Sequence, residues 1–146
     1  MKIGHVLSAS LEDYLEAIYH IVTEKQAVRA KDIARRLGVK NSSVTVALRS
    51  LAEKGLINYA PYDVITLTAE GKRLSKDVIQ RHEALRDFFV KVLSLDKDLS
   101  NKAACDMEHA LPRGILDRLT EFVEFVERCP HCLEEFRQEQ AQKKDG

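Results

Sequence analysis

The chain has 146 residues, a formal net charge of zero and 45% hydrophobic residues, which indicate a globular protein with one core or two small domains. No apolar run reaches the ~18 residues that span a bilayer, and the N-terminus has no secretory pattern, so we expect a cytoplasmic protein without membrane contact. The neutral average hides an asymmetry, because residues 25–75 have a net charge of +6 and residues 94–146 a net charge of −4. Such a basic segment favours DNA binding, although a run of charge by itself is more often a solvated face.

The first predicted element is a helix from Ser10 to about Lys25, because Ser10 and Asp13 have the spacing of a capping box. Apolar residues recur every three or four positions along it, so one of its faces is expected in a core. A short basic helix follows over about 30–37, and Gly38 ends it as a residue that readily adopts a positive φ.

The next helix opens at 41–43 and ends at Gly55, with apolar residues on one face only. Two β-prone runs, 56–59 and 64–67, flank a turn and predict a hairpin. A helix, a basic helix, a tight turn, an amphipathic helix and a hairpin follow one another in the winged helix-turn-helix. The alternative is a three-helix unit that contacts proteins, but the basic charge falls on this segment.

The exposed face of the third helix is the predicted DNA-contacting surface. Short hydroxyl side chains at a helix N-terminus suit phosphate oxygens, because free backbone N–H groups add to them. Lys40 and Ser42 are placed to reach base edges, and Val46 could contact a thymine methyl group. The predicted DNA-binding residues are Arg35, Arg36, Lys40, Asn41, Ser42, Ser43, Thr45, Val46 and Arg49.

The second half of the chain predicts helices only. Thr68 caps a long helix over about 69–93, and a polar joint separates it from a helix over about 99–111. A further helix runs from Arg113 to about Glu127 and is apolar on more than one face. So much apolar surface in a small protein predicts burial against a second copy, and hence a homodimer.

Cys105, Glu108 and His109 have i, i+3, i+4 spacing, so they would share one face of the predicted helix. A thiolate, a carboxylate and an imidazole together suit a divalent transition ion, whereas the ordinary alternative is a solvated Glu–His pair. Additional ligand-type residues are Asp13, Glu16, His82 and Glu83. Each also has an ordinary interpretation, as a capping acid, a solvated glutamate or a surface histidine.

The three cysteines are odd in number and follow no signal peptide, which argues against a disulfide framework. Cys129 and Cys132 form a C-x₂-C pair, which supplies two of the four ligands of a structural Zn²⁺ site. His131 or a second copy of the chain would complete such a site, and Glu83 is a further candidate for a second metal. The alternative is a pair of reduced thiols at a helix end.

Five segments together resemble the diphtheria-toxin-repressor and manganese-transport-regulator family: SLEDYLEAIY, DIARRLGVKNSSVTVALRSLAEKGLI, LTAEGKRL, RHEALRDFFVKVLSL and CDMEHALP. The spaced combination, over residues 8 to about 127, is specific, whereas no single segment is. Members are homodimeric repressors that bind double-stranded palindromic operators when activated by Fe²⁺ or Mn²⁺. The resemblance implies metal ligands at Asp13, Glu16, His82, Cys105, Glu108 and His109.

The chain departs from both branches of that family. The iron-type branch pairs a methionine in the first helix with a cysteine at 105, and the manganese-type branch pairs aspartate with glutamate, whereas this chain has Asp13 and Cys105. The iron branch's ancillary ligands would fall at Arg86 and Asn101, which are unsuited to that role, and the SH3-like domain of larger members is expected to be absent. Because thiolate is a soft ligand, Cys105 favours Fe²⁺ over Mn²⁺, and other divalent transition ions should bind in vitro.

The predicted fold class is mainly α. Residues 1–72 form a winged helix-turn-helix, residues 73–137 a helical metal-binding and dimerisation domain, and residues 138–146 a polar tail. The predicted function is a metal-dependent repressor of metal-uptake genes, in which an ion clamps the two domains together. The main alternative is a winged-helix regulator that senses redox state or an organic ligand. We expect neither an enzyme nor a small-molecule substrate, because no phosphate loop, nucleophile elbow or H-E-x-x-H pattern is present.

Overall fold

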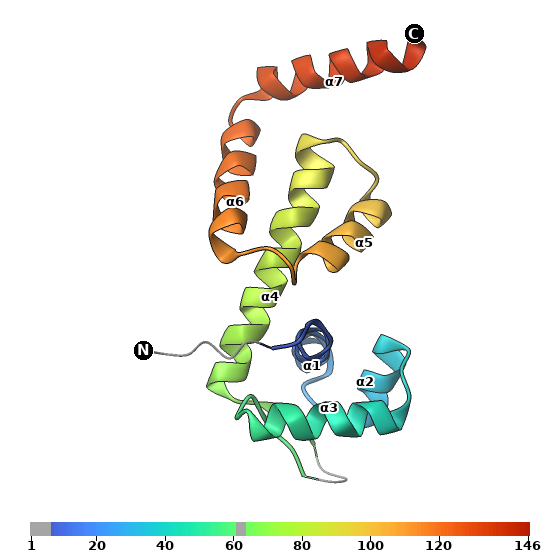
Figure 1. The fold of residues 1–146 in the computed structure, drawn as a ribbon, viewed down its shortest axis with the longest axis vertical. Coiled ribbons are helices and arrows are strands. Elements are labelled where there is room, and N and C mark those ends of the chain that lie inside the picture. Colours follow the sequence, from blue (N-terminus) through green and yellow to red (C-terminus); the bar gives the residue numbers. More distant parts are fainter. Residues whose placement is uncertain (1–6, 61–63) are drawn as a thin grey trace. The chain divides into compact units, whose positions relative to one another are not determined.

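The computed structural model describes residues 7–60 and 64–146 and divides the chain into two compact units, Met1–Ile79 and Gln80–Gly146. The division falls within the long helix α4 (Ala69–Asp87), and each unit is considered by itself (Figure 1). Within the described ranges, no helix is both long enough and apolar enough to cross a membrane.

The N-terminal unit has the predicted winged helix-turn-helix order. Its elements are α1 (Ala9–Lys25), α2 (Ala30–Leu37), α3 (Asn41–Glu53), β1 (Ile57–Asn58), β2 (Thr66–Leu67) and the start of α4. The strands are antiparallel, with Ile57 opposite Leu67. The Ile65 amide also donates to the Val28 carbonyl at 2.9 Å, which joins the hairpin to the segment between α1 and α2. The hairpin's predicted turn includes residues 61–63, which lie outside the described residues.

The core of this unit lies among α1, α2, α3 and the hairpin. Leu15, Ile18, Ile33 and Leu48 are completely buried, and they come from all three helices. The remaining buried apolar residues of the same cluster are Leu7, Tyr14, Ile21, Val28, Val44, Ala47, Leu51, Leu56, Ile57, Ile65 and Leu67. Because one face of each helix is used in this way, the other face of α3 is left to solvent.

The start of α1 differs from the sequence prediction. The N-cap is Ser8, whose Oγ accepts a hydrogen bond from the Leu11 amide at 3.2 Å, so the predicted capping box of Ser10 and Asp13 is wrong. Ser8 has an extended backbone, whereas Ser10 already lies inside the helix. Asp13 is therefore not the acid of an N-terminal capping motif, and its ordinary interpretation no longer applies.

The turns predicted at glycines are confirmed. Gly38 and Gly55 have φ values of 65° and 72°, conformations that favour glycine. The Thr68 hydroxyl accepts from the Gly71 amide at 3.1 Å, as a cap of α4 should, and donates to the Gly55 carbonyl at 2.7 Å. Thr68 thus ties the end of α3 to the start of α4.

The C-terminal unit contains the rest of α4, the π-helical turn η1 (Phe88–Val92), α5 (Lys97–Met107), α6 (Arg113–Glu127) and α7 (Pro130–Asp145). The predicted helix over 69–93 is thus α-helical only as far as Asp87. The buried cluster is small and contains Leu85, Ala104 and Leu116. Contacts of Phe88 with Phe122 and of Lys91 with Glu127 join η1 to α6.

The Lys91 ammonium lies 2.8 Å from a Glu127 carboxylate oxygen. This hydrogen bond raises the pKa of Lys91, with a smaller contribution from the charge of Asp87. Because both side chains are 43% exposed, the pair is expected to contribute at most about 1 kcal/mol to stability.

Helix α7 corrects the prediction of a polar tail at residues 138–146, because it continues to Asp145. None of its described residues is fully buried, and Arg137 Nε donates to Ser94 Oγ at 3.1 Å. The polar composition was interpreted correctly, but long Glu, Gln and Lys side chains also favour a helix without requiring a core.

Candidate metal centre and DNA-binding surface

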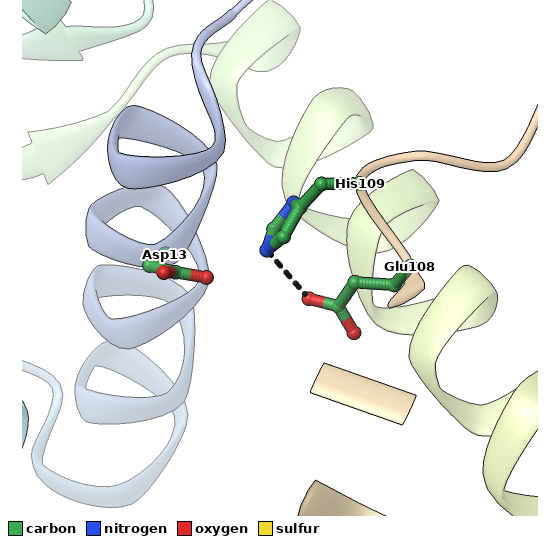
Figure 2. Close-up of side chains that lie close together, drawn as sticks. All are labelled: Asp13, Glu108 and His109. Atoms are coloured by element: carbon green, nitrogen blue, oxygen red, sulfur yellow. Dashed lines mark ion pairs between the residues drawn. The ribbon is translucent and has the colours of Figure 1, made fainter. Parts of the chain in front are cut away.

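Glu108 is the centre of the polar cluster in the C-terminal unit. It follows the last residue of α5 and is completely buried, which is unusual for a carboxylate without a partner of opposite charge. The Nδ1 atom of His82, on α4, lies 2.8 Å from Glu108 Oε2. The Nε2 atom of His109 lies 3.3 Å from Glu108 Oε1, the pair drawn with a dashed line in Figure 2.

The two carboxylate oxygens differ in their hydrogen bonding. Among the described residues, no donor makes a hydrogen bond to Glu108 Oε1, although the His109 ring is within ion-pair distance of it. A buried carboxylate oxygen that has left water without such a bond is costly, and a cation beside it removes that cost. One carboxylate and two imidazoles are also donors that divalent transition ions accept, so these residues fit a metal ion.

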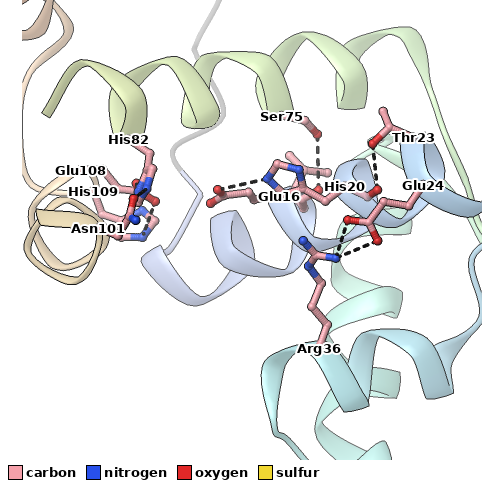
Figure 3. A network of polar contacts seen from close by, with 11 residues as sticks. Glu16, His20, Thr23, Glu24, Arg36, Ser75, His82, Asn101, Glu108 and His109 are labelled. Atoms are coloured by element: carbon pink, nitrogen blue, oxygen red, sulfur yellow. Dashed lines mark hydrogen bonds and ion pairs between the residues drawn. The ribbon is translucent and has the colours of Figure 1, made fainter. Parts of the chain in front are cut away.

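Two further side chains hold this cluster in place. Asn101, on α5, has its Oδ1 atom 3.3 Å from His82 Nε2 (Figure 3). Arg81 Nη1 donates to the Glu108 carbonyl at 3.3 Å. Side chains that contact a ligand without touching the ion commonly fix the ring orientation that metal binding needs. Sequence reasoning considered Asn101 only as a poor ligand and did not single out Arg81. In the sequence, the signal that could have pointed to Arg81 is its position next to His82.

Cys105 does not share the environment of Glu108 and His109. Its side chain is exposed, whereas Glu108 is buried and His109 is partly buried. Cys105 is therefore exposed beside the cluster of His82, Glu108 and His109. Helix α5 ends at Met107, so helical spacing does not extend to His109.

Asp13 and Glu16 belong to the N-terminal unit, where both lie partly buried on α1. A Glu16 carboxylate oxygen lies 3.6 Å from His20 Nε2, one turn further along the helix, as Figure 3 shows. Figure 2 also draws Asp13, whose carboxylate projects from the same helix. Sequence reasoning missed His20, although its i, i+4 spacing from Glu16 was visible.

The candidates for a second metal do not form a cluster. Cys129 and Cys132 are joined by a disulfide, so the predictions of reduced thiols and of a structural Zn²⁺ site are both wrong for this form of the chain. A disulfide sulfur lacks the thiolate charge that binds zinc. Glu83 is exposed on α4, and His131 is exposed and lies 3.9 Å from Glu135. The odd cysteine count had argued against a disulfide, but the two Cα atoms are only 5.5 Å apart.

The predicted DNA-contacting residues lie on α2, α3 and the turn between them. All of them are exposed except Thr45, which is partly buried and whose hydroxyl donates to the Asn41 carbonyl at 3.1 Å. Val46 is 68% exposed, a large value for an apolar side chain. This fits a surface that another molecule covers.

Arg36 is already engaged within the N-terminal unit. Its Nη1 atom lies 3.0 and 3.2 Å from the two carboxylate oxygens of Glu24, at the end of α1 (Figure 3). A phosphate would have to compete with that carboxylate for the Arg36 guanidinium. Arg35 and Lys40 are exposed as well.

Comparison with known protein families gives matches over most of the chain. Residues 6–65 match the family described as "Iron dependent repressor, N-terminal DNA binding domain". Residues 68–137 match the family described as "Iron dependent repressor, metal binding and dimerisation domain". The two matched segments meet near the start of α4 and assign DNA binding and metal binding to different parts of the chain.

Individual proteins are similar over nearly the same length. An HTH-type transcriptional regulator of Methanocaldococcus jannaschii is 39% identical over 81% of this chain and 95% of that protein. The HTH-type transcriptional regulator MntR of Lysinibacillus sphaericus is 32% identical over 91% of this chain and 95% of that protein. A solved "Manganese-dependent transcriptional repressor complex with manganese" is 30% identical with a TM-score of 0.70. The match covers 79% of this chain and 53% of the solved one, so this chain spans about half its length.

Proposed function

Because the chain belongs to the iron-dependent repressor family, whose members are metal-dependent DNA-binding regulators that dimerise through the C-terminal domain, we propose that it represses metal-uptake genes. In this proposal a homodimer binds a palindromic operator when a divalent ion is bound, and releases it when the ion is lost. The family consists of transcriptional regulators, not enzymes.

The observation that supports metal dependence best is the buried carboxylate of Glu108. Its Oε1 atom accepts no hydrogen bond from the described residues, and two imidazoles lie within 3.3 Å of its oxygens. A bound divalent cation would supply the positive charge that this carboxylate lacks. His82 and His109 supply nitrogen donors beside it, and Asn101 orients the His82 ring.

We extend the proposal to six ligands: Asp13, Glu16, His82, Cys105, Glu108 and His109. The resemblance to the family supports this set, and it draws on α1 of the N-terminal unit as well as on the C-terminal unit. Ligands on both units would fix where the recognition helix α3 points in each half of the dimer. Two half-sites on one face of DNA need recognition helices about 34 Å apart, so restricting other separations strengthens operator binding.

The DNA contacts of this proposal come from α3 and its neighbourhood. Lys40 and Ser42 would read base edges, and the exposed Val46 would contact a thymine methyl group. Arg35 and Arg49 would bind phosphates, as would Arg36 after it leaves Glu24. The remaining polar side chains at the start of α3 would add hydrogen bonds to the backbone.

We propose Fe²⁺ as the first candidate ion, on the ground that Cys105 adds a soft thiolate to the donors. Mn²⁺ is the second candidate, favoured by the exposure of Cys105 and by the manganese complex of the solved relative. A Cys105→Ser variant separates the two. If Fe²⁺ is preferred through the thiolate, the variant loses Fe²⁺ affinity and keeps Mn²⁺ affinity, and an unchanged preference would remove the argument for Fe²⁺.

The test of the function uses DNA selected by the protein itself. Operator duplexes are enriched from a randomised pool with Mn²⁺-loaded protein, and their affinity is then measured by fluorescence anisotropy under anaerobic conditions. We expect chelation of the metal to weaken operator binding about 5- to 150-fold, the usual range of such coupling. Equal affinity with and without metal would overturn the proposal.

A regulator that responds to oxidation is the second candidate function, and the Cys129–Cys132 disulfide favours it. The same anisotropy assay distinguishes the two. A metal-dependent repressor loses its operator on chelation at constant redox state. A redox regulator ignores the chelator and loses or gains the operator when a reductant is added.

A further inference from the structure

The Cys129–Cys132 disulfide lies at the junction of α6 and α7, outside the proposed metal ligands. Cys129 is the N-cap of α7, Pro130 is its first residue, and Cys132 belongs to its first turn. The Cys132 amide donates to the Cys129 carbonyl at 3.0 Å, which closes the turn between the two cysteines. The pair is therefore positioned by the local start of a helix.

The disulfide lies at the surface of the C-terminal unit. Cys132 is exposed and Cys129 is partly buried, so an attacking thiol can approach from the side of Cys132. Between them, Pro130 is exposed and the His131 side chain is 87% exposed. A disulfide that only stiffens a core is normally shielded, whereas exposed disulfides are the ones that exchange.

The helix start favours the reduced form of the pair. The positive end of the helix dipole stabilises a thiolate at the first turn more than a neutral disulfide. In the hollow beside Pro130, Lys91 is paired with Glu127, and Arg137 adds a further positive charge. Because the thiolate is stabilised in this way, thiols should reduce the disulfide to the dithiol readily.

The Cys129–Cys132 disulfide contributes little to the stability of the fold. The cysteines are three positions apart, and a loop this short restricts the unfolded chain far less than a long one does. Helix α7 has other attachments to the same unit, including the hydrogen bond from Arg137 to Ser94. Reduction of the disulfide should therefore leave α7 folded.

We propose that Cys129 and Cys132 form a reversible thiol–disulfide exchange site whose substrates are low-molecular-weight thiols and their disulfides. A small thiolate attacks Cys132 Sγ, the Cys129–Cys132 bond breaks, and Cys129 leaves as a thiolate. A second small thiolate attacks the outer sulfur of the mixed disulfide and releases Cys132. The protein disulfide gains two electrons and two protons, and two small thiols become one small disulfide. This chemistry does not depend on the proposed repressor function.

The test equilibrates the full chain in glutathione buffers that run from mostly reduced to mostly oxidised. Samples are quenched with acid, returned to mildly alkaline buffer that contains iodoacetamide, and analysed by mass spectrometry of the peptide that contains both cysteines. We expect this peptide to change from unmodified to doubly alkylated within that range, because only the reduced thiols react with iodoacetamide. Cys105, which lies outside this C-x₂-C pair, is the internal control and should be alkylated whenever it is not glutathionylated.

Two results would overturn the proposal. If the disulfide is reduced only after denaturant is added, it is structural and does not exchange in the folded chain. If both cysteines stay reduced in excess oxidised glutathione, they do not form a disulfide under these conditions. A third measurement adds Zn²⁺ to the reduced chain. Stoichiometric uptake that a Cys129→Ser, Cys132→Ser double variant loses would make the pair a metal site in place of an exchange site.

Single variants identify the attacked sulfur. Cys129→Ser should accumulate a glutathione adduct at Cys132, because the second cysteine can no longer displace it. Circular dichroism of each variant checks that the helices persist. The exchange should be the same with Mn²⁺ or with chelator, so a failure here leaves the metal-dependent repressor proposal untouched, and the reverse also holds.

Discussion

At the scale of single residues, Glu108 is the side chain whose charge the proposed metal centre requires. A Glu108→Gln substitution keeps the size but removes the negative charge between His82 and His109. We expect the affinity for Mn²⁺ or Fe²⁺, measured by calorimetry under anaerobic conditions, to fall by a factor of at least about 10–100, the loss seen for residues that merely support ligands.

The matched control is Glu83→Gln, an identical change at an exposed position on the same helix as His82. It should leave the metal affinity unchanged. If Glu108→Gln bound the ion as tightly as the parent chain, Glu108 would not be a ligand, and the assignment of the centre would fail.

Weakening the ion pair between Glu24 and Arg36 is expected to raise the affinity for operator DNA. Arg36 Nη1 lies 3.0 Å from the Glu24 carboxylate, so the guanidinium must leave this partner to bind a phosphate. Glu24→Gln weakens that competition, and we expect operator affinity to rise a few-fold, since an exposed pair is worth ~0–1 kcal/mol. Anisotropy titrations at several salt concentrations measure it. Glu53→Gln, exposed at the end of α3, controls for the lost charge, and a gain of the same size there would show a general charge effect.

The residue types of the metal centre could be predicted from the sequence, but their arrangement in space could not. Ligand-type side chains at 82, 108 and 109 are visible in the sequence, and the structure brings these three together. The exposure of Cys105 was not predictable, because burial depends on which tertiary neighbours pack against each side of α5. Likewise, Ser8 and Ser10 are both good N-caps, and only the backbone conformation selects Ser8.

At the scale of elements, the close contact between the hairpin and α4 depends on Gly71, which has no side chain. A Cβ atom at Gly71 would overlap the carbonyl oxygen of Leu56, so α4 can approach β1 closely only with glycine at this position. We expect Gly71→Ala to destabilise the N-terminal unit by about 1–3 kcal/mol or more, the usual cost of overpacking. Urea unfolding followed by circular dichroism measures the change.

Gly114→Ala is the matched control for that substitution. Gly114 also lies in a helix, near the start of α6, and a Cβ atom there meets no atom within 4 Å. Because alanine favours helices over glycine by up to about 1 kcal/mol, the control should be neutral or stabilising. Equal destabilisation of both variants would contradict the overlap as the cause.

Elements with their own local signals were predicted well. The positive-φ glycines and the periodicity of α3 are sequence-local, and so the N-terminal unit was predicted nearly element by element. The π-helical turn after Asp87 and the continuation of α7 were missed, because the first depends on packing of Phe88 against α6 and the second has no apolar stripe. Sequence patterns carry no information where tertiary contacts decide the backbone.

At the scale of the whole molecule, the two units have surfaces of different kinds. The N-terminal unit presents exposed basic and hydroxyl side chains on α2 and α3, whereas the C-terminal unit exposes large apolar side chains on α6. Ile115, Phe122 and Phe125 are 49%, 47% and 55% exposed. These residues recur at i, i+7 and i+10, so they lie along one side of the helix, and the small core of this unit leaves them uncovered. Because the family dimerises through this domain, the exposed apolar stripe on α6 indicates a dimerisation surface.

The dimer prediction is tested by placing a charge in that stripe. Phe125→Glu should shift the chain from dimer to monomer in analytical ultracentrifugation, because a buried carboxylate in an apolar interface has no partner. Glu124→Lys, also exposed on α6 but off the apolar stripe, is the control and should remain dimeric. A monomer can occupy only one half-site, so Phe125→Glu should also lose most of its operator affinity while its metal affinity stays unchanged. A Phe125→Glu chain that remained dimeric would place the interface elsewhere on the molecule, and a monomer that still bound the full operator tightly would show that dimerisation is not what couples the two half-sites.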